Sequence, residues 1–511
     1  MSNELGRQSD GSVASRGLVR RSVVGVVWTS LAMGAQSIMQ LIALIVLARL
    51  LSPTEFGLFA AALVVLGIST IFSELGVGPA IVQRPTLEER HLRAGFTLSL
   101  LLSHAVAALV WAGAPAIAGF FQLPELSQVV RVASLMFVFH GIAAVAQGLA
   151  QRELRFRWLA GVEAGAFGVG FVLAGPVLAW LGFGIWALVG AHLIQHFVRM
   201  VVLLAGQPHP KQLLLERRAI NELLYFGGGF TVARIGNFIA GQGDKLVAGR
   251  WLGAQALGFY VHAYQLITAP ATLVGQVLDR VLFPTMALVQ GEPARLARAY
   301  RSGVAVCALL ILPASVVVAI VASEIVLVLL GPAWAGVVVP LRILAVGMLF
   351  RTSYKLSDSV ARATGAVYAR AWRQGAYAGA VVAGSLVGQV WGLGGMALGV
   401  LAAITANFAL MAHLSLRLIG MRWSEFAAAH LPAFALAAVI GPGAWALAGW
   451  LRELHVSPVV LLADVAVFAS AASLLLCCCM PALFLGQDAR SLFRTVASLA
   501  PMRLQRRLLA S

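Results

Sequence analysis

Long apolar segments separated by short polar ones make up this chain from residue 23 to residue 484. An α-helix needs about 20 apolar residues to cross a lipid bilayer. The segments that meet this length have the approximate limits 23–50, 57–81, 94–120, 129–150, 159–181, 185–205, 223–249, 257–283, 303–329, 336–354, 374–391, 395–416, 427–450 and 459–484. The pattern therefore predicts an all-α polytopic membrane protein with about fourteen transmembrane helices.

The composition supports this interpretation. Of the 511 residues, 60% are hydrophobic and only 11% are charged, whereas a soluble chain carries about 25% charged residues. The net charge of +17 does not require nucleic acid as a partner, because the loops of membrane proteins on the cytoplasmic side are rich in Lys and Arg. The first apolar run is much longer than the core of a signal peptide, so we expect a retained first helix.

Basic residues concentrate in every second polar segment. These segments are 1–22, 82–93, 151–158, 206–222, 284–302, 355–373, 417–425 and the tail 485–511. The segments between them contain Arg452, with Arg49 and Arg250 at their margins. The positive-inside rule then predicts that both termini are cytoplasmic, which agrees with an even number of helices.

The predicted outer loops are short, and no loop on either face is long enough to fold as a domain. A membrane enzyme that polymerises or ligates saccharides usually needs a pocket outside the bilayer. We therefore expect a protein that is not an enzyme and that works within its helical bundle. The chain has no nucleotide-binding loop, so direct coupling to ATP is not expected, and neither is another cofactor.

A short sequence repeats at an offset of 201 residues. The first copy is Arg49–Phe59, between the first two helices, and the second is Arg250–Tyr260, between the seventh and eighth. The matching pairs are Arg49 with Arg250, Leu51 with Leu252, Gly57 with Gly258, and Phe59 with Tyr260. Copies that lie six helices apart have the same orientation in the membrane, which predicts a parallel repeat of two six-helix lobes around a central cavity. Arg49, Gly57, Arg250 and Gly258 would then be structural corners of the two lobes.

This repeat divides the chain into predicted parts. The N-lobe covers 23–205, a cytoplasmic linker 206–222, and the C-lobe 223–416. Two further helices occupy 427–484, outside the repeat, and a basic tail follows at 485–511.

The same passages resemble a known family. Ala48–Phe59 with Glu74–Gln83 resembles the first helical pair of Wzx-type polysaccharide flippases, and Gly243–Tyr260 is similar to the seventh and eighth helices of that family. These flippases belong to a superfamily that also contains lipid II flippases and multidrug antiporters. The resemblance implies alternating access and a substrate of undecaprenyl pyrophosphate carrying an oligosaccharide. It also implies that the membrane is the cell inner, or plasma, membrane, and a role in exopolysaccharide or lipopolysaccharide O-antigen synthesis. Polysaccharide polymerase and chain-length proteins are the other partners it suggests.

Polar residues at membrane depth are costly, so each is a candidate functional residue. The predicted seventh helix carries Arg234, Asn237, Asp244 and Lys245. Arg234 and Lys245 lie about three turns apart on one face, and Asn237 shares that face with Arg234. We expect Arg234, Lys245 and Asn237 to contact pyrophosphate or acidic sugar. The alternative for Lys245 is a local pair with Asp244 at the end of the helix.

Other basic residues have two interpretations. Arg131, near the outer start of the fourth helix, and Arg280 are further candidates for substrate binding. Arg199, Arg280 and Arg351 lie towards cytoplasmic helix ends, where long side chains can instead reach the interface. This second interpretation is the stronger one for those three residues.

The acidic residues suggest how transport could couple to an ion. Glu74, Asp244 and Asp279 are the candidates for proton or cation coupling, because burial raises the pKa of a carboxyl group towards neutrality. Glu163 and Asp464 are further acidic residues within the predicted helices. His192 and His196 lie four residues apart on one helical face, but no third ligand is near in sequence, so we expect packed polar residues and no metal site.

Three functions remain open. A flippase for lipid-linked oligosaccharide fits the basic residues at membrane depth. A multidrug or cation antiporter of the same superfamily would have a cavity rich in acidic residues. A polysaccharide polymerase or ligase would need a long outer loop, which the sequence lacks.

Overall fold

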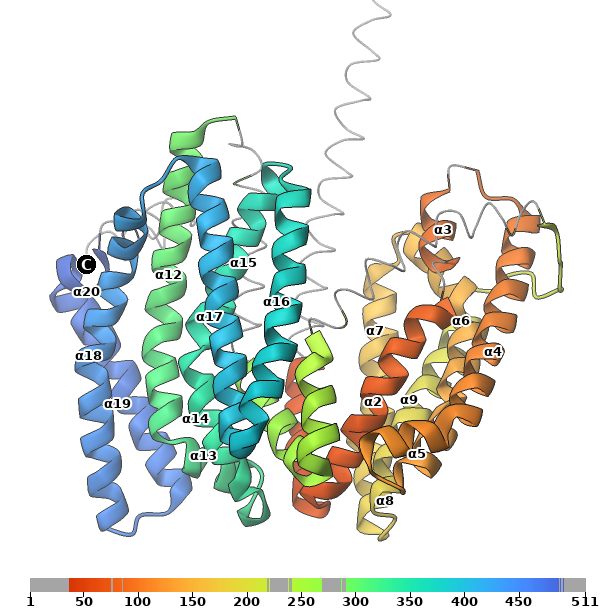
Figure 1. The fold of residues 1–511 in the computed structure, drawn as a ribbon, viewed down its shortest axis with the longest axis horizontal. Helices are drawn as coiled ribbons and strands as arrows, with labels where there is room; N and C mark the ends of the chain where they lie inside the picture. The colour runs from red at the N-terminus through yellow and green to blue at the C-terminus, as the bar shows by residue number, and fades with distance from the viewer. Residues whose placement is uncertain are drawn as a thin grey trace, which may run out of the picture. The chain divides into compact units, whose positions relative to one another are not determined.

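The computed structural model describes residues 36–490, except 75, 76, 85, 218, 219, 221–237, 239, 240, 269–285, 287–290, 487 and 489 (Figure 1). Every regular element within this part is helical. The chain divides into two compact units, Met1–Ile235 and Gly236–Ser511, called here the N-unit and the C-unit. The all-α membrane fold expected from the sequence is confirmed.

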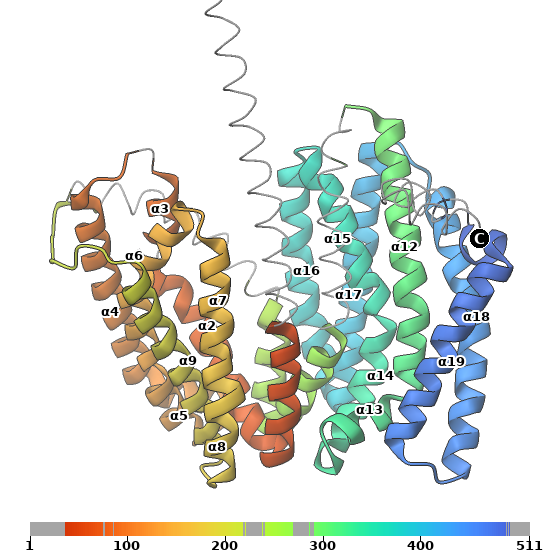
Figure 2. The same ribbon diagram turned by 180° about the vertical axis from the view of Figure 1, so that it is seen from behind.

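The N-unit is a bundle of helices joined by short turns (Figures 1 and 2). A helix over Gln36–Leu50 comes first. The elements that follow are α2 (Pro53–Glu74), α3 (Val77–Gln83), α4 (Glu89–Phe121), α5 (Leu126–Ala133), α6 (Leu135–Arg152), α7 (Phe156–Phe167), the π-helix η1 (Gly168–Ala174), α8 (Gly175–Trp180) and α9 (Ile185–Gly206).

The C-unit begins with a helix over 241–247 that continues into the π-helix η2 (Ala248–Leu252), followed by a helix over 253–268. The later elements are α12 (Pro293–Ile320), α13 (Ala322–Leu329), η3 (Pro332–Val337), α14 (Val338–Val346), α15 (Met348–Ala363), α16 (Val367–Gly388), η4 (Gln389–Trp391), α17 (Gly392–Ile419), α18 (Trp423–Glu453), α19 (Pro458–Cys479) and α20 (Pro481–Phe484).

The number of membrane crossings can be counted only where the structure describes the chain. There, nine helices are long and apolar enough to cross a bilayer, or up to ten if the bent pair Pro332–Val346 and Met348–Ala363 forms one span. Parts of the first, seventh and eighth predicted helices lie outside the described residues. The number of fourteen transmembrane helices therefore stays a prediction, and so do the boundaries of the two lobes.

One predicted loop is wrong. The basic segment 355–373 was expected to connect two helices, but α15 continues to Ala363 and α16 begins at Val367. Only residues 364–366 connect them, with Gly365 at a φ of +70°. The apolar pattern misplaced these boundaries because α15 carries charged residues along part of its surface and packs its other residues inside the unit.

The two copies of the repeated sequence start a helix in different ways. In the first, the Ser52 hydroxyl accepts the amide of Glu55 at 3.3 Å, and the Glu55 carboxylate accepts the amide of Ser52 at 2.7 Å. This reciprocal pair is a capping box, which satisfies donors at the start of α2. In the second copy, the position of Ser52 is taken by Gly253, whose φ of +84° breaks η2 from the helix that follows.

Glycines bring α16 and α17 into close contact. A Cβ added to Gly384 would lie 2.5 Å from the carbonyl oxygen of Gly399, and one added to Gly388 would lie 2.2 Å from that of Gly395. Both helices therefore present a glycine every four residues at the contact, an arrangement that lets helix backbones approach in membranes. Figure 1 shows the two helices side by side over their length.

The last long helices of the C-unit pack on α12 and α13. α18 lies along α12, and both it and α19 contribute to an apolar cluster with Val321. At one end of α18, Arg452 donates from Nε and Nη2 to the Glu324 carboxylate at 2.8 and 3.1 Å. Such a two-point arginine–carboxylate pair has a fixed geometry, so it joins α18 to α13.

Candidate functional site

The C-unit contains a cluster of polar side chains between its first described helices and α15. It consists of Gln242, Asp244, Lys245, Tyr260, Tyr264 and Arg351 and is called here the Lys245–Arg351 cluster. Two of its members, Asp244 and Lys245, were predicted site residues. Arg351 was not, because its position near a helix end suggested that it reaches the membrane interface.

Tyr264 holds both cations of this cluster. The guanidinium carbon of Arg351 lies 4.2 Å from the centre of the Tyr264 ring, and an Arg351 nitrogen donates to the Tyr264 hydroxyl. Lys245 Nζ lies 5.6 Å from the same ring centre and donates to Gln242 Oε1 at 2.7 Å. The electron-rich ring face and the amide oxygen stabilise two positive charges inside the bundle. The interface interpretation of Arg351 is therefore wrong.

Asp244 has a different role in the cluster. Its side chain is buried, and Oδ2 accepts a hydrogen bond from the Tyr260 hydroxyl at 2.6 Å. The amide of Lys245 donates to Oδ1 at 2.9 Å. The carboxylate thus joins the helix over 241–247 to the helix over 253–268. Its predicted role in ion coupling stays a prediction.

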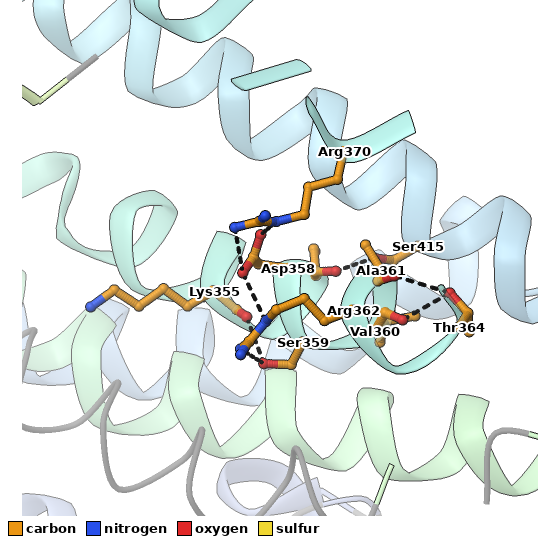
Figure 3. A network of polar contacts seen from close by, with 10 residues as sticks. Lys355, Asp358, Ser359, Val360, Ala361, Arg362, Thr364, Arg370 and Ser415 are labelled. Carbon is orange, nitrogen blue, oxygen red and sulfur yellow. Dashed lines mark hydrogen bonds and ion pairs between the residues drawn. The ribbon is translucent and has the colours of Figure 1, made fainter. Parts of the chain in front are cut away.

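A stripe of charged residues, mostly cations, continues from this cluster along α15. It consists of Arg351, Lys355, Asp358 and Arg362, at intervals of four, three and four residues. This spacing places them on one side of the helix over about 16 Å. Figure 3 shows Arg362 and Arg370 converging on Asp358, and the Arg362 Nε lies 3.1 Å from Asp358 Oδ2. The acid is therefore shared by two arginines, and the stripe is basic overall.

The buried side of α15 is also polar and is held by hydroxyl groups. The Tyr300 and Ser357 hydroxyls are 2.8 Å apart, and the Ser415 hydroxyl donates to the Ser357 carbonyl oxygen at 3.1 Å. α15 is thus anchored to α12 and α17 through hydrogen bonds, and this leaves its charged residues on its remaining side.

The N-unit contains a second polar cluster, the histidine cluster, made of His140 on α6 with His192 and His196 on α9. His140 Nε2 and His196 Nδ1 are 2.9 Å apart, and the His192 and His196 ring centres are 4.4 Å apart. The ring of Phe59, in the first repeat copy, meets His192 at 5.8 Å. Sequence analysis found the His192–His196 pair but missed His140, which comes from another helix.

One turn along α9 from these histidines, Arg199 is buried and paired. Its Nε donates to Glu163 of α7 at 2.5 Å, and its Nη2 donates to Gln147 of α6 at 2.8 Å. The expectation that Arg199 reaches the membrane interface is wrong. An acid and a base at similar depth on neighbouring helices could have indicated this pair from the sequence.

The remaining predicted residues are placed only in part. Arg131 packs on Trp111 of α4, with its guanidinium carbon 4.9 Å from the ring centre. Gly57 and Gly258 are buried at their helix starts, and Arg250 lies 5.7 Å from the ring of its neighbour Trp251. Arg234, Asn237, Asp279 and Arg280 lie outside the described residues, and of Glu74 only the backbone at the end of α2 is described. The structure places Arg49 at the end of the first described helix.

Comparison with known proteins finds similarity to proteins of polysaccharide biosynthesis. Residues 46–339 match the model of the family described as "Polysaccharide biosynthesis protein". The teichuronic acid biosynthesis protein TuaB of Bacillus subtilis (strain 168) is 25% identical over 359 residues, which are 68% of this chain and 72% of that protein. The lipopolysaccharide biosynthesis protein WzxC of Escherichia coli (strain K12) is 26% identical over 341 residues, 66% and 68% of the two chains.

Among solved structures, the fold is similar to that of lipid II flippase MurJ in an inward closed conformation. The TM-score is 0.71, and the similarity covers 88% of this chain and 97% of the other. With 13% sequence identity, this similarity concerns the fold.

Proposed function

Because this chain belongs to the polysaccharide biosynthesis protein family, we propose that it moves a lipid-linked oligosaccharide across the membrane. The substrate would be a polyprenyl pyrophosphate carrying an oligosaccharide repeat unit, transferred from the cytoplasmic to the periplasmic leaflet. The named relatives that work in teichuronic acid and lipopolysaccharide synthesis support this class of substrate.

The observation that carries the proposal is the Lys245–Arg351 cluster. It brings two cations onto one tyrosine inside the helical bundle, and α15 adds Lys355 and Arg362 on the side that carries Arg351. Placing cations at membrane depth costs about 2.5–3.5 kcal/mol each on insertion scales. An anionic ligand would offset this cost, and a guanidinium can donate two parallel hydrogen bonds to a phosphate.

The membrane potential gives the transport a direction. A pyrophosphate lipid carries roughly two negative charges and the cytoplasm is electrically negative, so outward movement is favoured by about 4.6 kcal/mol per 100 mV. The unfavourable step is the return of an empty, positively charged site. Proton binding at Glu74 or Asp279 would couple this return step to the proton gradient. Asp244 is a further candidate for the coupling residue.

The remaining parts of the proposal concern topology and partners. The protein would lie in the inner membrane, and the basic segments support an orientation with both termini cytoplasmic. Alternating access of two lobes would expose the substrate site first to one leaflet and then to the other. A polysaccharide polymerase and chain-length proteins would take up the product, in exopolysaccharide or lipopolysaccharide O-antigen synthesis.

The proposal is tested with the purified protein in liposomes that contain a polyprenyl-pyrophosphate-linked oligosaccharide in one leaflet. Appearance of the saccharide in the other leaflet is measured with a membrane-impermeant lectin. We expect transfer that depends on the protein and responds to an imposed potential. Export of ethidium without transfer of the lipid would instead indicate a multidrug antiporter. A Glu74→Gln variant that keeps its response to a pH gradient would exclude Glu74 as the coupling residue.

A further inference from the structure

A groove on the N-unit, between α7 with η1 on one side and α9 on the other, has no role in the mechanism proposed above. Its volume is about 720 Å³. Val169 lines one wall, Val198 and Val202 line the other, and Gly161 and Gly165 contribute no side chain. All of these residues belong to helices long and apolar enough to cross a membrane. An occupant over this length must therefore be apolar.

One end of the groove is basic. Arg155 and Arg157 line it together with Trp158. The guanidinium carbon of Arg155 lies 4.4 Å from the centre of the Trp158 ring, and its Nη1 donates to the carbonyl oxygen of Gly206 at 2.7 Å. These contacts hold one arginine at the end of the groove. The exposed side chain of Arg157 lies in the same turn of the chain.

A groove of similar size in the C-unit provides a comparison. It lies between α16 and α17, has a volume of about 680 Å³, and is lined by glycine, alanine, valine, leucine and tryptophan alone. In the predicted repeat, α16 and α17 correspond to α7 and α9. The two grooves thus differ in charge. Of the two, the N-unit groove is the one that has arginines at the end of its apolar lining.

We propose that the N-unit groove is a loading site separate from the Lys245–Arg351 cluster, and that it binds the polyprenyl tail of the carrier lipid with its phosphate at Arg155 and Arg157 before transfer. This inference rests on the proposed function. The ligand has the required chemistry, an apolar chain that ends in an anion. Polyprenyl chains carry a methyl branch on every isoprene unit, and a Cβ added at Gly161 or Gly165 meets nothing within 4 Å. The two open positions accept such branches, which the straight chains of ordinary phospholipids lack.

The test uses the full-length protein in liposomes with a polyprenyl phosphate that carries a photoreactive diazirine in its tail. After irradiation, mass spectrometry locates the labelled peptides. We expect labelling in α7 and α9, and at least a fivefold loss of it in the double variant Gly161→Leu/Gly165→Leu. The matched control is Gly375→Leu/Gly379→Leu on α16. These glycines have the same spacing and nothing within 4 Å of an added Cβ, and neither lines a groove described above.

Two further measurements separate the carrier from other lipids and locate its phosphate. Excess unlabelled polyprenyl phosphate should abolish the labelling, whereas excess phosphatidylglycerol should leave it unchanged. Arg157→Gln should raise the concentration of unlabelled polyprenyl phosphate needed for half-maximal competition several-fold. Equal competition by phosphatidylglycerol would overturn the proposal, as would undiminished labelling of the Gly161→Leu/Gly165→Leu variant.

The outcomes also distinguish this inference from the proposed function. Labelling does not require transport, so specific labelling in a protein that transfers no oligosaccharide would support the groove and refute the flippase. Normal transfer by the Gly161→Leu/Gly165→Leu variant, with labelling outside α7 and α9, would refute the groove and leave the flippase intact.

Discussion

His140 Nε2 and His196 Nδ1 lie 2.9 Å apart, although 56 residues separate them in the chain. A hydrogen bond between two imidazoles requires one ring to donate and the other to accept. It joins α6 to α9 inside the N-unit, where His192 extends the cluster towards Phe59. His140 and His196 thus satisfy one another, and His192 packs beside them with its Nε2 3.3 Å from Met136 Sδ.

We therefore expect His196→Phe to destabilise the protein without changing the coupling of transport to a proton gradient. Loss of the partner leaves a buried imidazole nitrogen without this hydrogen bond, at a cost of about 1–3 kcal/mol. The midpoint of thermal unfolding in detergent should fall, while the response of transport to a pH gradient should stay the same. His104→Phe is the control, because His104 is exposed on α4. A folded His196→Phe protein that no longer responds to the gradient would show that the cluster binds a transported proton.

The hydrogen bond between Tyr260 and Asp244 predicts non-additive effects on stability. Tyr260→Phe removes the donor at 2.6 Å from a buried carboxylate, which should cost about 1–3 kcal/mol. The same substitution should cost less in an Asp244→Asn background, because the carboxylate is then absent. Thermal unfolding of the four proteins measures this difference. Tyr368→Phe, at a residue 92% exposed, is the control, and strictly additive effects would contradict the prediction.

Substitution of the cations in the Lys245–Arg351 cluster should impair transport more than stability. If the cluster is the phosphate site, Arg351→Gln and Lys245→Gln would each remove one charge-assisted hydrogen bond to phosphate, worth about 1.5–3 kcal/mol, which corresponds to a roughly 10- to 150-fold loss of substrate affinity. The loss of affinity is measured from the rate at which the oligosaccharide becomes accessible to lectin at several substrate concentrations.

Two comparisons make the result specific to the cluster. Arg351→Lys should retain more affinity than Arg351→Gln, because the positive charge remains. Arg131→Gln should have little effect, since Arg131 packs on Trp111 in the N-unit. Wild-type affinity in both Arg351→Gln and Lys245→Gln would refute the cluster as the phosphate site.

The glycines between α16 and α17 should tolerate no side chain. A Cβ at residue 399 would lie 2.0 Å from the carbonyl oxygen of Gly384, so Gly399→Ala must separate the two helices, at a cost of about 1–3 kcal/mol. Gly375→Ala, where nothing lies within 4 Å of the added atom, should be neutral or stabilising. Equal thermal stability of the two variants would show that the helices do not pack as closely as described.

The class of fold was predictable from the sequence alone. An apolar segment of about 20 residues in lipid can satisfy its backbone only as a helix, and outside 355–373 the described helices lie close to the predicted segments. The resemblance carried by Arg49–Phe59 and Gly243–Tyr260 indicated the family, and residues 46–339 match its model. The sequence also singled out Lys245 as a candidate site residue, because a cation in an apolar helix is unusual. The structure places it in the Lys245–Arg351 cluster.

The partners of these residues were decided by tertiary structure. Apolar periodicity assigned 355–373 to a loop, since a charged helix inside a bundle has the composition of a surface segment. Arg351, Arg199 and His140 each find a partner on another helix, between 36 and 87 residues away. Hydropathy records the cost of burying each group separately, whereas the stabilising contact depends on which helices pack together. The sequence therefore determined that the chain forms long apolar helices and which residues are costly within them, and helix packing decided which charges meet.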